Sequence, residues 1–231
     1  LEFRRVLFRS EYGASATYMS EVAGRSHRGF WSSFNYVTLI GGQLVALVVL
    51  IVLQRILSAP DMNAWGWRIP FVIGALLAVV AYIVRSRMAE SLSFIEAKAS
   101  EVERGSTRTL FKAHPRETLT ILGLTAGGSM TFYVYTTYMQ KFLSNTAGFS
   151  KDQATEISAA ALLVFMVAQP VVGWLSDKVG RKTMLLIAFG GGALVTWPLM
   201  SAIGSTRAES TAFWLMLIGM LVQTGYTAIK I

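Results

Sequence analysis

The stretch Gly173–Lys182 reads Gly-Trp-Leu-Ser-Asp-Lys-Val-Gly-Arg-Lys and lies between two long apolar segments. It fits the pattern G-x-x-x-D-[RK]-x-G-R-[RK], which gathers one acid and several bases in a few residues. A charged stretch of this kind between apolar segments is typical of two membrane helices joined at the membrane surface. The pattern therefore predicts a compact charged turn between two spanning helices.

The composition also favours a membrane protein. Of the 231 residues, 53% are hydrophobic and 15% are charged, and the mean hydropathy is +0.49, whereas a soluble domain carries about 25% charged residues. The chain has no cysteine, which excludes disulfides, zinc–thiolate sites and thiol nucleophiles. The two histidines, His27 and His114, lie in polar stretches. We therefore expect neither a metal nor another cofactor.

Six apolar runs are long enough to cross about 30 Å of hydrocarbon, which takes roughly 20 helical residues. They are Phe30–Leu57, Trp67–Arg85, Thr118–Leu143, Ala154–Leu175, Thr183–Ile203 and Thr211–Ile229. A seventh run, Glu11–Val22, would extend only about 18 Å as a helix, so it is predicted to be half of one. These runs predict an all-α membrane protein.

The positive charges indicate the orientation of the chain in the membrane. The net charge is +8, and the lysines and arginines cluster between the apolar runs, so no nucleic-acid partner is expected. The loops on the side of Gly173–Lys182 hold 12 lysines and arginines, and the loops on the other side hold 5. Cytoplasmic loops carry such an excess. The Gly173–Lys182 turn is therefore predicted to face the cytoplasm.

The longest polar segment, residues 88–117, divides the runs into two groups and is predicted to be a cytoplasmic linker. Residues 11–87 then hold the end of a first helical bundle, and residues 118–231 hold the start of a second. Residues 1–10 read LEFRRVLFRS, and three arginines are costly within a membrane helix, so we expect a non-native leader there. The abrupt ends predict an internal fragment.

Several strings resemble the major facilitator superfamily of secondary transporters, and within it the metabolite:proton symporter branch that includes carriers of α-ketoglutarate. The Gly173–Lys182 pattern is similar to the cytoplasmic loop signature of the superfamily. The strings that resemble the branch are Glu11-Tyr-Gly followed by ATYMSEVA, Tyr36-Val-Thr-Leu-Ile-Gly-Gly-Gln43, Gly66-Trp-Arg-Ile-Pro-Phe71 and Thr137-Tyr-Met-Gln-Lys-Phe142 followed by SNTAG. The resemblance covers about residues 11 to 229. It implies helices four to ten of a fold made of two six-helix halves.

The resemblance also implies a function. A carrier of this branch would lie in the bacterial inner membrane as a monomer and import a small organic acid with a proton by alternating access. The implied substrate is a dicarboxylate such as α-ketoglutarate. An osmolyte (proline or betaine), citrate and shikimate are alternative substrates within the branch.

Two alternatives come from other classes of protein. The first is a polytopic membrane enzyme, but the apolar runs contain no serine nucleophile motif, paired aspartates or H-E-x-x-H, so no catalytic residue is expected. The second is an inactive, truncated chain.

Two charged residues could act in transport. Glu11 lies where the fourth helix should be deep in the bilayer, and a charged carboxylate is costly there, so it is the candidate proton-coupling residue. The alternative for Glu11 is a structural pair with an arginine elsewhere. Arg68, at the outer end of the sixth helix, could bind a carboxylate through its guanidinium group. The favoured interpretation of Arg68 is anchoring beside Trp67 at the membrane interface.

Polar side chains on the seventh helix form a second candidate set for substrate binding. Tyr133, Thr137, Gln140 and Lys141 recur three or four residues apart, which would place them on one face of a helix. Hydroxyl, amide and ammonium groups on one face would suit a dicarboxylate in a water-filled cavity. Ordinary helix packing is the alternative.

The fifth and eighth helices add further candidates. Tyr36 and Gln43 are seven residues apart and would share a face, which predicts a second cavity lining. The pair Gln169-Pro170 predicts a kink in the eighth helix, and Gln169 could also face the cavity.

The charged turn is predicted to act on conformation and not on the substrate. In the family that it resembles, the aspartate of this loop sits against the positive end of a neighbouring helix and pairs with the arginine while the cytoplasmic side is shut. The resemblance places this gating role on Gly173, Asp177, Gly180, Arg181 and Lys182. It places the neighbour at the start of the fifth helix, near Gly29-Phe30.

Overall fold

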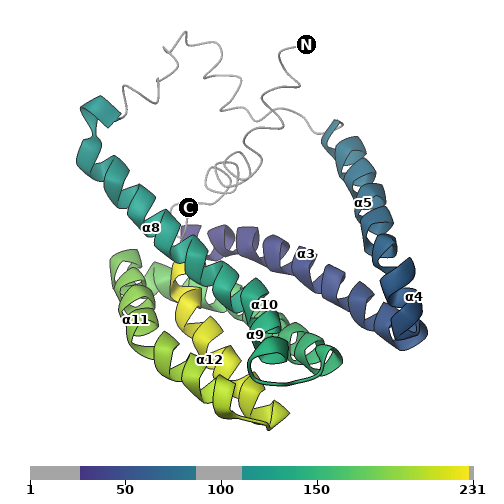
Figure 1. Cartoon of the computed structure of the whole chain (residues 1–231). Coiled ribbons are helices and arrows are strands. Elements are labelled where there is room, and N and C mark those ends of the chain that lie inside the picture. Colours follow the sequence, from purple (N-terminus) through teal and green to yellow (C-terminus); the bar gives the residue numbers. More distant parts are fainter. Residues whose placement is uncertain (1–26, 87–110, 229–231) are drawn as a thin grey trace. The chain divides into compact units, whose positions relative to one another are not determined.

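The computed structural model describes residues 27–86 and 111–228. The predicted leader, the half-helix Glu11–Val22 and most of the predicted linker lie outside the described residues. The regular elements of the described part are all helices, as predicted (Figure 1). They are α3 (Arg28–Ile56), α4 (Ala59–Ala64), η1 (Gly66–Arg68), α5 (Ile69–Ser86), α8 (Pro115–Tyr133), η2 (Val134–Tyr138), α9 (Met139–Asn145), α10 (Lys151–Val179), α11 (Arg181–Ser205) and α12 (Glu209–Thr227).

All six predicted spans are helical, and their ends lie within a few residues of the predicted ones. Four segments are long and apolar enough to cross a membrane: Arg28–Ile56, Gly66–Val84, Lys151–Val179 and Arg181–Ser205. Among the described residues, the predicted spans at 118–143 and 211–229 do not form single helices that meet this criterion. The first of these is interrupted by η2, a π turn of five residues that the sequence did not predict.

Local hydrogen bonds explain where two of the helices begin. At the start of α10, the Gln153 N–H donates to Ser150 Oγ at 3.1 Å, and the Ser150 N–H donates to Gln153 Oε1 at 2.8 Å, which is a capping box. At the start of α4, the Asp61 N–H donates to Ser58 Oγ at 3.3 Å. Both serines satisfy N–H groups that the first turn of a helix leaves unpaired.

A single glycine separates α10 from α11. Gly180 has a φ of +96°, which residues with a Cβ atom rarely adopt, and its N–H donates to the Ser176 carbonyl at 3.0 Å. The sequence predicted a turn over Gly173–Lys182, but the helix continues through Val179 and resumes at Arg181. The predicted turn was therefore too long, because one residue with positive φ is enough to end the helix.

Replacing Gly180 with alanine is expected to destabilise the chain by about 1–2 kcal/mol, because alanine is strained at positive φ. Thermal unfolding in detergent measures this loss. Gly190, inside α11, has open space where a Cβ would lie, and its replacement with alanine is the matched control. Equal unfolding temperatures for the two variants would contradict the strain at Gly180.

By their contacts, the helices divide into two compact units, which we describe separately. The first unit contains α3 up to Val52 and the chain from Gly128 onward, and the second contains Leu53–Gly127. Most of α3 is thus grouped with α10, α11 and α12, although the sequence assigned it to the first bundle. The domain boundaries predicted at 11–87 and 118–231 remain a prediction.

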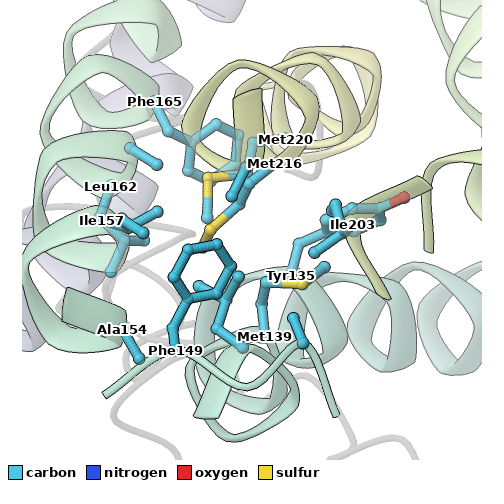
Figure 2. Packing of buried hydrophobic residues seen from close by; sticks show 14 of the residues in the cluster. Tyr135, Met139, Phe149, Ala154, Ile157, Leu162, Phe165, Ile203, Met216 and Met220 are labelled. Carbon is cyan, nitrogen blue, oxygen red and sulfur yellow. The ribbon is translucent and has the colours of Figure 1, made fainter. Parts of the chain in front are cut away.

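The core of the first unit consists of aromatic rings, aliphatic side chains and methionines from helices distant in the sequence (Figure 2). Tyr135 and Met139 come from η2 and α9, Phe165 from α10, and Met216 and Met220 from α12. Methionine is flexible enough to fill the gaps that rigid rings leave. Because α12 packs along both α10 and α11, these residues join the helices into one core.

Two tyrosines pack α12 closely against α8 and η2. The ring of Tyr135 covers Gly219 of α12, and the ring of Tyr226 covers Gly128 of α8. Tyr135 also donates a hydrogen bond from Oη to Thr196 Oγ1 at 3.2 Å, which reaches α11. Along each helix the two contacts are seven residues apart and in opposite order, so the helices are antiparallel. Glycine permits this close approach because it has no side chain.

In the second unit, α4, η1 and α5 follow one another with a tight bend. Gly66 is buried, and a Cβ atom there would lie 2.7 Å from Leu57 Cδ1 and 3.0 Å from Met62 Sδ. A larger residue at this position would have to displace the ends of these two side chains. Most apolar side chains of α5 are exposed, which suits a helix in contact with lipid.

Candidate functional site

The carboxylate of Asp177, near the end of α10, contacts the beginning of α3. The Gly29 N–H donates to Asp177 Oδ1 at 2.7 Å, and the Phe30 N–H donates to Oδ2 at 3.1 Å. These N–H groups belong to the first turn of α3, where they have no partner within the helix, and the helix dipole favours a negative charge there. The predicted contact of Asp177 with Gly29-Phe30 is confirmed.

Two glycines allow Asp177 to reach this helix end. A Cβ atom at Gly173 would lie 2.5 Å from the Gly29 carbonyl oxygen and 2.9 Å from Ser33 Cβ. A Cβ atom at Gly29 would lie 2.5 Å from the Gly173 carbonyl oxygen and 2.8 Å from Asp177 Oδ1. The backbones of α3 and α10 therefore meet at Gly29 and Gly173. Asp177 follows Gly173 by one helical turn and lies on the same face of α10.

The basic residues around Asp177 point elsewhere. Arg181 and Lys182 are exposed in the first turn of α11. The Nζ of Lys178 lies 3.7 Å from the centroid of the Trp174 ring, in a cation–π contact. In the described part of the chain, no ion pair joins Asp177 to Arg181. The predicted Asp177–Arg181 pair is therefore not present in this conformation, because the carboxylate is directed at the start of α3.

The predicted face of the seventh helix divides into two environments. Tyr133 is 60% exposed, and Thr137 and Lys141 are also exposed. Gln140 is half-buried, and its Nε2 donates to Thr155 Oγ1 of α10 at 2.9 Å. The spacing assumed a continuous α-helix, but Thr137 lies within the π turn η2. π turns occur frequently at functional sites, and a role of these four residues in substrate binding remains a prediction.

The two candidates on α3, Tyr36 and Gln43, also differ in how deeply they are buried. Tyr36 is 4% exposed, and its ring packs edge-on against Phe132 of α8 with centroids 5.2 Å apart. Gln43 is half-buried, and its buried Oε1 has no hydrogen-bond partner within residues 27–86 and 111–228. Tyr36 thus lies in the core, and Gln43 holds a polar atom without a partner.

The two charged candidates lie outside the first unit or outside the described residues. In the second unit, Arg68 Nη1 donates to the Ala64 carbonyl at 3.1 Å, and its guanidinium carbon lies 4.8 Å from the centroid of the Trp67 ring. These contacts agree with anchoring, the favoured interpretation of Arg68. Glu11 lies outside the described residues.

The sequence singled out Gln169 but not the buried polar residues of α12, one of which contacts it. Gln169 of α10 and Gln223, Thr224 and Thr227 of α12 are all buried. Thr227 Oγ1 donates to Gln169 Oε1 at 2.9 Å. The signal available in the sequence was the presence of three polar residues within five positions of an apolar run. Polar groups are costly inside a membrane and mark functional positions there.

The polar contacts of the described candidate residues are hydrogen bonds and cation–π contacts. In residues 27–86 and 111–228, no group of three or more histidine, aspartate or glutamate side chains is placed to hold a metal ion. One polar contact between distant segments places the Asp177 carboxylate on the start of α3. Such a contact can form and break as two helices approach and separate.

Comparisons with known proteins show which family the sequence matches. Residues 10–230 match the family model described as Major Facilitator Superfamily. The chain is 48% identical over 220 residues to the alpha-ketoglutarate permease of Escherichia coli (strain K12). The aligned region covers 95% of the chain and 50% of that protein. No solved structure matches.

More distant relatives have other substrates in their names. The chain is 28% identical over 188 residues to the proline/betaine transporter of Escherichia coli (strain K12), covering 77% of the chain and 37% of that protein. It is 26% identical over 211 residues to the citrate-proton symporter of Salmonella typhi, covering 88% of the chain and 48% of that protein. The chain thus spans half or less of the length of these relatives.

Proposed function

The chain belongs to the Major Facilitator Superfamily, and from this premise we propose that it is part of a secondary transporter that carries a small organic acid together with a proton. The proposed substrate is a dicarboxylate such as α-ketoglutarate. The observation that supports this substrate is 48% identity, over nearly the whole chain, to a protein named alpha-ketoglutarate permease. The proposed location is the inner membrane of a bacterium, with the full-length carrier as a monomer.

The contact between Asp177 and α3 supports transport by alternating access. In this mechanism, two helical bundles move against each other around a central substrate site. We propose that the contact holds the cytoplasmic side shut and that Gly173, Gly180, Arg181 and Lys182 complete this gate. The contact suits such a gate because the carboxylate on the helix start is held by two hydrogen bonds and contributes only about 1–2 kcal/mol. It can therefore break in every transport cycle.

The remaining roles follow from the chemistry of the side chains. Glu11 is the proposed proton-coupling residue, because a carboxylate within the bilayer is costly to keep charged. The proposed substrate-binding residues are Tyr36, Gln43, Arg68, Tyr133, Thr137, Gln140 and Lys141. A proton that enters with a dicarboxylate reduces the negative charge that must cross the membrane, where each charge is worth about 2.3 kcal/mol per 100 mV.

An osmolyte such as proline or betaine is the second candidate substrate. The supporting observation is the similarity to a proline/betaine transporter at 28% identity. A zwitterion carries no net charge and has less need of cations such as Arg68 and Lys141 than a dicarboxylate does. The dicarboxylate is therefore preferred.

Uptake by the full-length carrier distinguishes these substrates. Cells or vesicles that contain it are expected to accumulate labelled α-ketoglutarate but not labelled proline, and a proton uncoupler should stop the accumulation. Uptake of proline without α-ketoglutarate would overturn the proposed substrate. Uptake of α-ketoglutarate that is unaffected by the uncoupler would overturn the coupling to protons.

A further inference from the structure

Among the described residues, one of the two polar atoms of the buried Gln169 amide has a hydrogen-bond partner and the other has none. Gln169 is 0% exposed, and its Oε1 accepts from Thr227 Oγ1 at 2.9 Å. Its Nε2 is also buried and has no hydrogen-bond partner among the residues that the structure describes. A buried donor without a partner costs about 1–3 kcal/mol. Such groups are rare in folded proteins, so this one calls for a partner in another state of the molecule.

Thr227 sets the orientation of this amide. Its Oγ1 lies 2.9 Å from Gln169 Oε1, closer than it lies to the carbonyl oxygens of Gln223 and Thr224 at 3.4 Å and 3.3 Å, so Gln169 is its nearest acceptor. With Oε1 held, the two N–H groups of Gln169 remain directed away from Thr227. The result is an oriented hydrogen-bond donor within an apolar bundle.

Three other polar side chains of the first unit, those of Gln140, Gln43 and Ser158, differ from Gln169 in what they offer to a carboxylate. The amide nitrogen of Gln140 is already bound to Thr155. On Gln43, the buried atom that lacks a partner among the described residues is an oxygen, which accepts hydrogen bonds and does not donate them. Ser158 Oγ has no partner either, but a helical serine can turn its hydroxyl to a carbonyl of the preceding turn.

Gln169 lies where α10 is able to bend. Pro170 follows it inside the helix and cannot donate the backbone hydrogen bond that a helix requires at this position. Helices bend at such points. A change of bend at Pro170 would move α10 relative to α12 and open the contact between Gln169 and Thr227 to a ligand.

We propose that the Gln169 amide donates hydrogen bonds to a carboxylate group of the transported acid, and that Thr227 is a positioning residue for this amide. The proposal rests on the proposed function, because it concerns the recognition of its substrate. Hydrogen bonds from an oriented donor to a carboxylate are among the strong ones. The acid would therefore favour the conformation in which α10 and α12 admit it, since a ligand shifts a protein toward the state that it binds better.

The test compares Gln169→Leu with the unmodified full-length carrier. The variant is expected to raise the dissociation constant for α-ketoglutarate about 10-fold to 100-fold, which is the usual effect of a lost hydrogen bond to a charged group. Its thermal stability in detergent should be unchanged or higher, because leucine removes a buried donor without a partner. Thr227 keeps the Gln223 and Thr224 carbonyls as acceptors, so it is not left without one.

Three further variants complete the test. Ser158→Ala, on the same helix, removes another buried polar atom and should leave binding unchanged. Gln169→Glu replaces the donor with an acceptor of similar shape and should weaken binding at least as much as leucine does. Thr227→Val leaves the Gln169 amide in place but removes the hydroxyl that orients it. This variant should therefore weaken binding less than Gln169→Leu does, by about 3-fold to 10-fold.

The outcomes separate this inference from the proposed function. If the unmodified carrier binds the acid and Gln169→Leu binds it equally well, the inference fails while the proposed function stands. Retained binding in Gln169→Glu would also overturn it. If the unmodified carrier does not bind or take up the acid, the proposed function fails and the inference fails with it.

Discussion

Replacing Asp177 with asparagine in the full-length carrier is expected to lower the maximal rate of transport about fivefold or more, while substrate affinity changes little. The carboxylate accepts hydrogen bonds from the Gly29 and Phe30 N–H groups at the start of α3. Asparagine lacks the negative charge and retains one acceptor oxygen, so the contact weakens by about 1–2 kcal/mol. That loss shifts the balance between shut and open cytoplasmic sides about 5-fold to 30-fold.

The rate should fall because a transport cycle needs both conformations. A carrier that no longer shuts its cytoplasmic side spends most of its time open to the cytoplasm and returns slowly to the outward-facing state. Asp177→Ala, which removes both acceptors, should have the larger effect of the two. Affinity should persist because Asp177 lies at the end of α10, where its carboxylate accepts hydrogen bonds from the start of α3.

The rate is measured as uptake into reconstituted vesicles, and affinity as equilibrium binding in detergent. The matched control is Asp152→Asn, because Asp152 is an exposed acid in the first turn of the same helix. Asp152→Asn should transport at the normal rate. An unchanged rate in Asp177→Asn would contradict the gating role of this contact.

Replacing Gly219 or Gly128 with alanine is expected to destabilise the carrier by about 1–3 kcal/mol, the usual cost of an overpacked core. A Cβ atom at Gly219 would lie 2.7 Å from Cζ and 2.9 Å from Oη of Tyr135. A Cβ atom at Gly128 would overlap the ring of Tyr226. Neither ring can bend, so the helices must move apart or the tyrosine must leave the core.

Thermal unfolding in detergent measures this effect, again with Gly190→Ala as the control. Gly190 also lies within a helix, but no atom is within 4 Å of a Cβ built there. Alanine favours helices over glycine by about 0.5–1 kcal/mol, so the control should be as stable as the unmodified chain or more so. A smaller residue at Tyr135 should restore part of the stability of Gly219→Ala. Equal stability of Gly219→Ala and Gly190→Ala would refute the close packing of α12 on η2.

Much of the fold could be predicted from local features of the sequence. The six apolar runs predicted the helices, because a membrane helix satisfies its own backbone hydrogen bonds and needs only a sufficient length of apolar residues. The pattern at Gly173–Lys182 and its resemblance to a known loop also predicted the contact of Asp177 with α3. This short pattern was sufficient to predict the contact, because Gly173 and Asp177, which both approach α3, lie on one face of a single helix.

The structure was needed for features that depend on how distant helices align. The π turn η2 leaves no clear trace in the hydrophobic pattern, so the sequence predicted an uninterrupted helix over 118–143. The contacts of Tyr135 with Gly219 and of Gln169 with Thr227 join residues at least 58 positions apart.

The sequence by itself therefore determined that the chain is a set of membrane helices and to which family they belong, and it predicted how they are oriented. These properties follow from the length, polarity and charge of single segments, which lipid and water sort directly. The tertiary structure alone decided which polar groups are paired and which are left without a partner. A shift of one residue in the register of α12 against α10 would turn Thr227 about 100° away from Gln169, and no local pattern in either helix records that alignment.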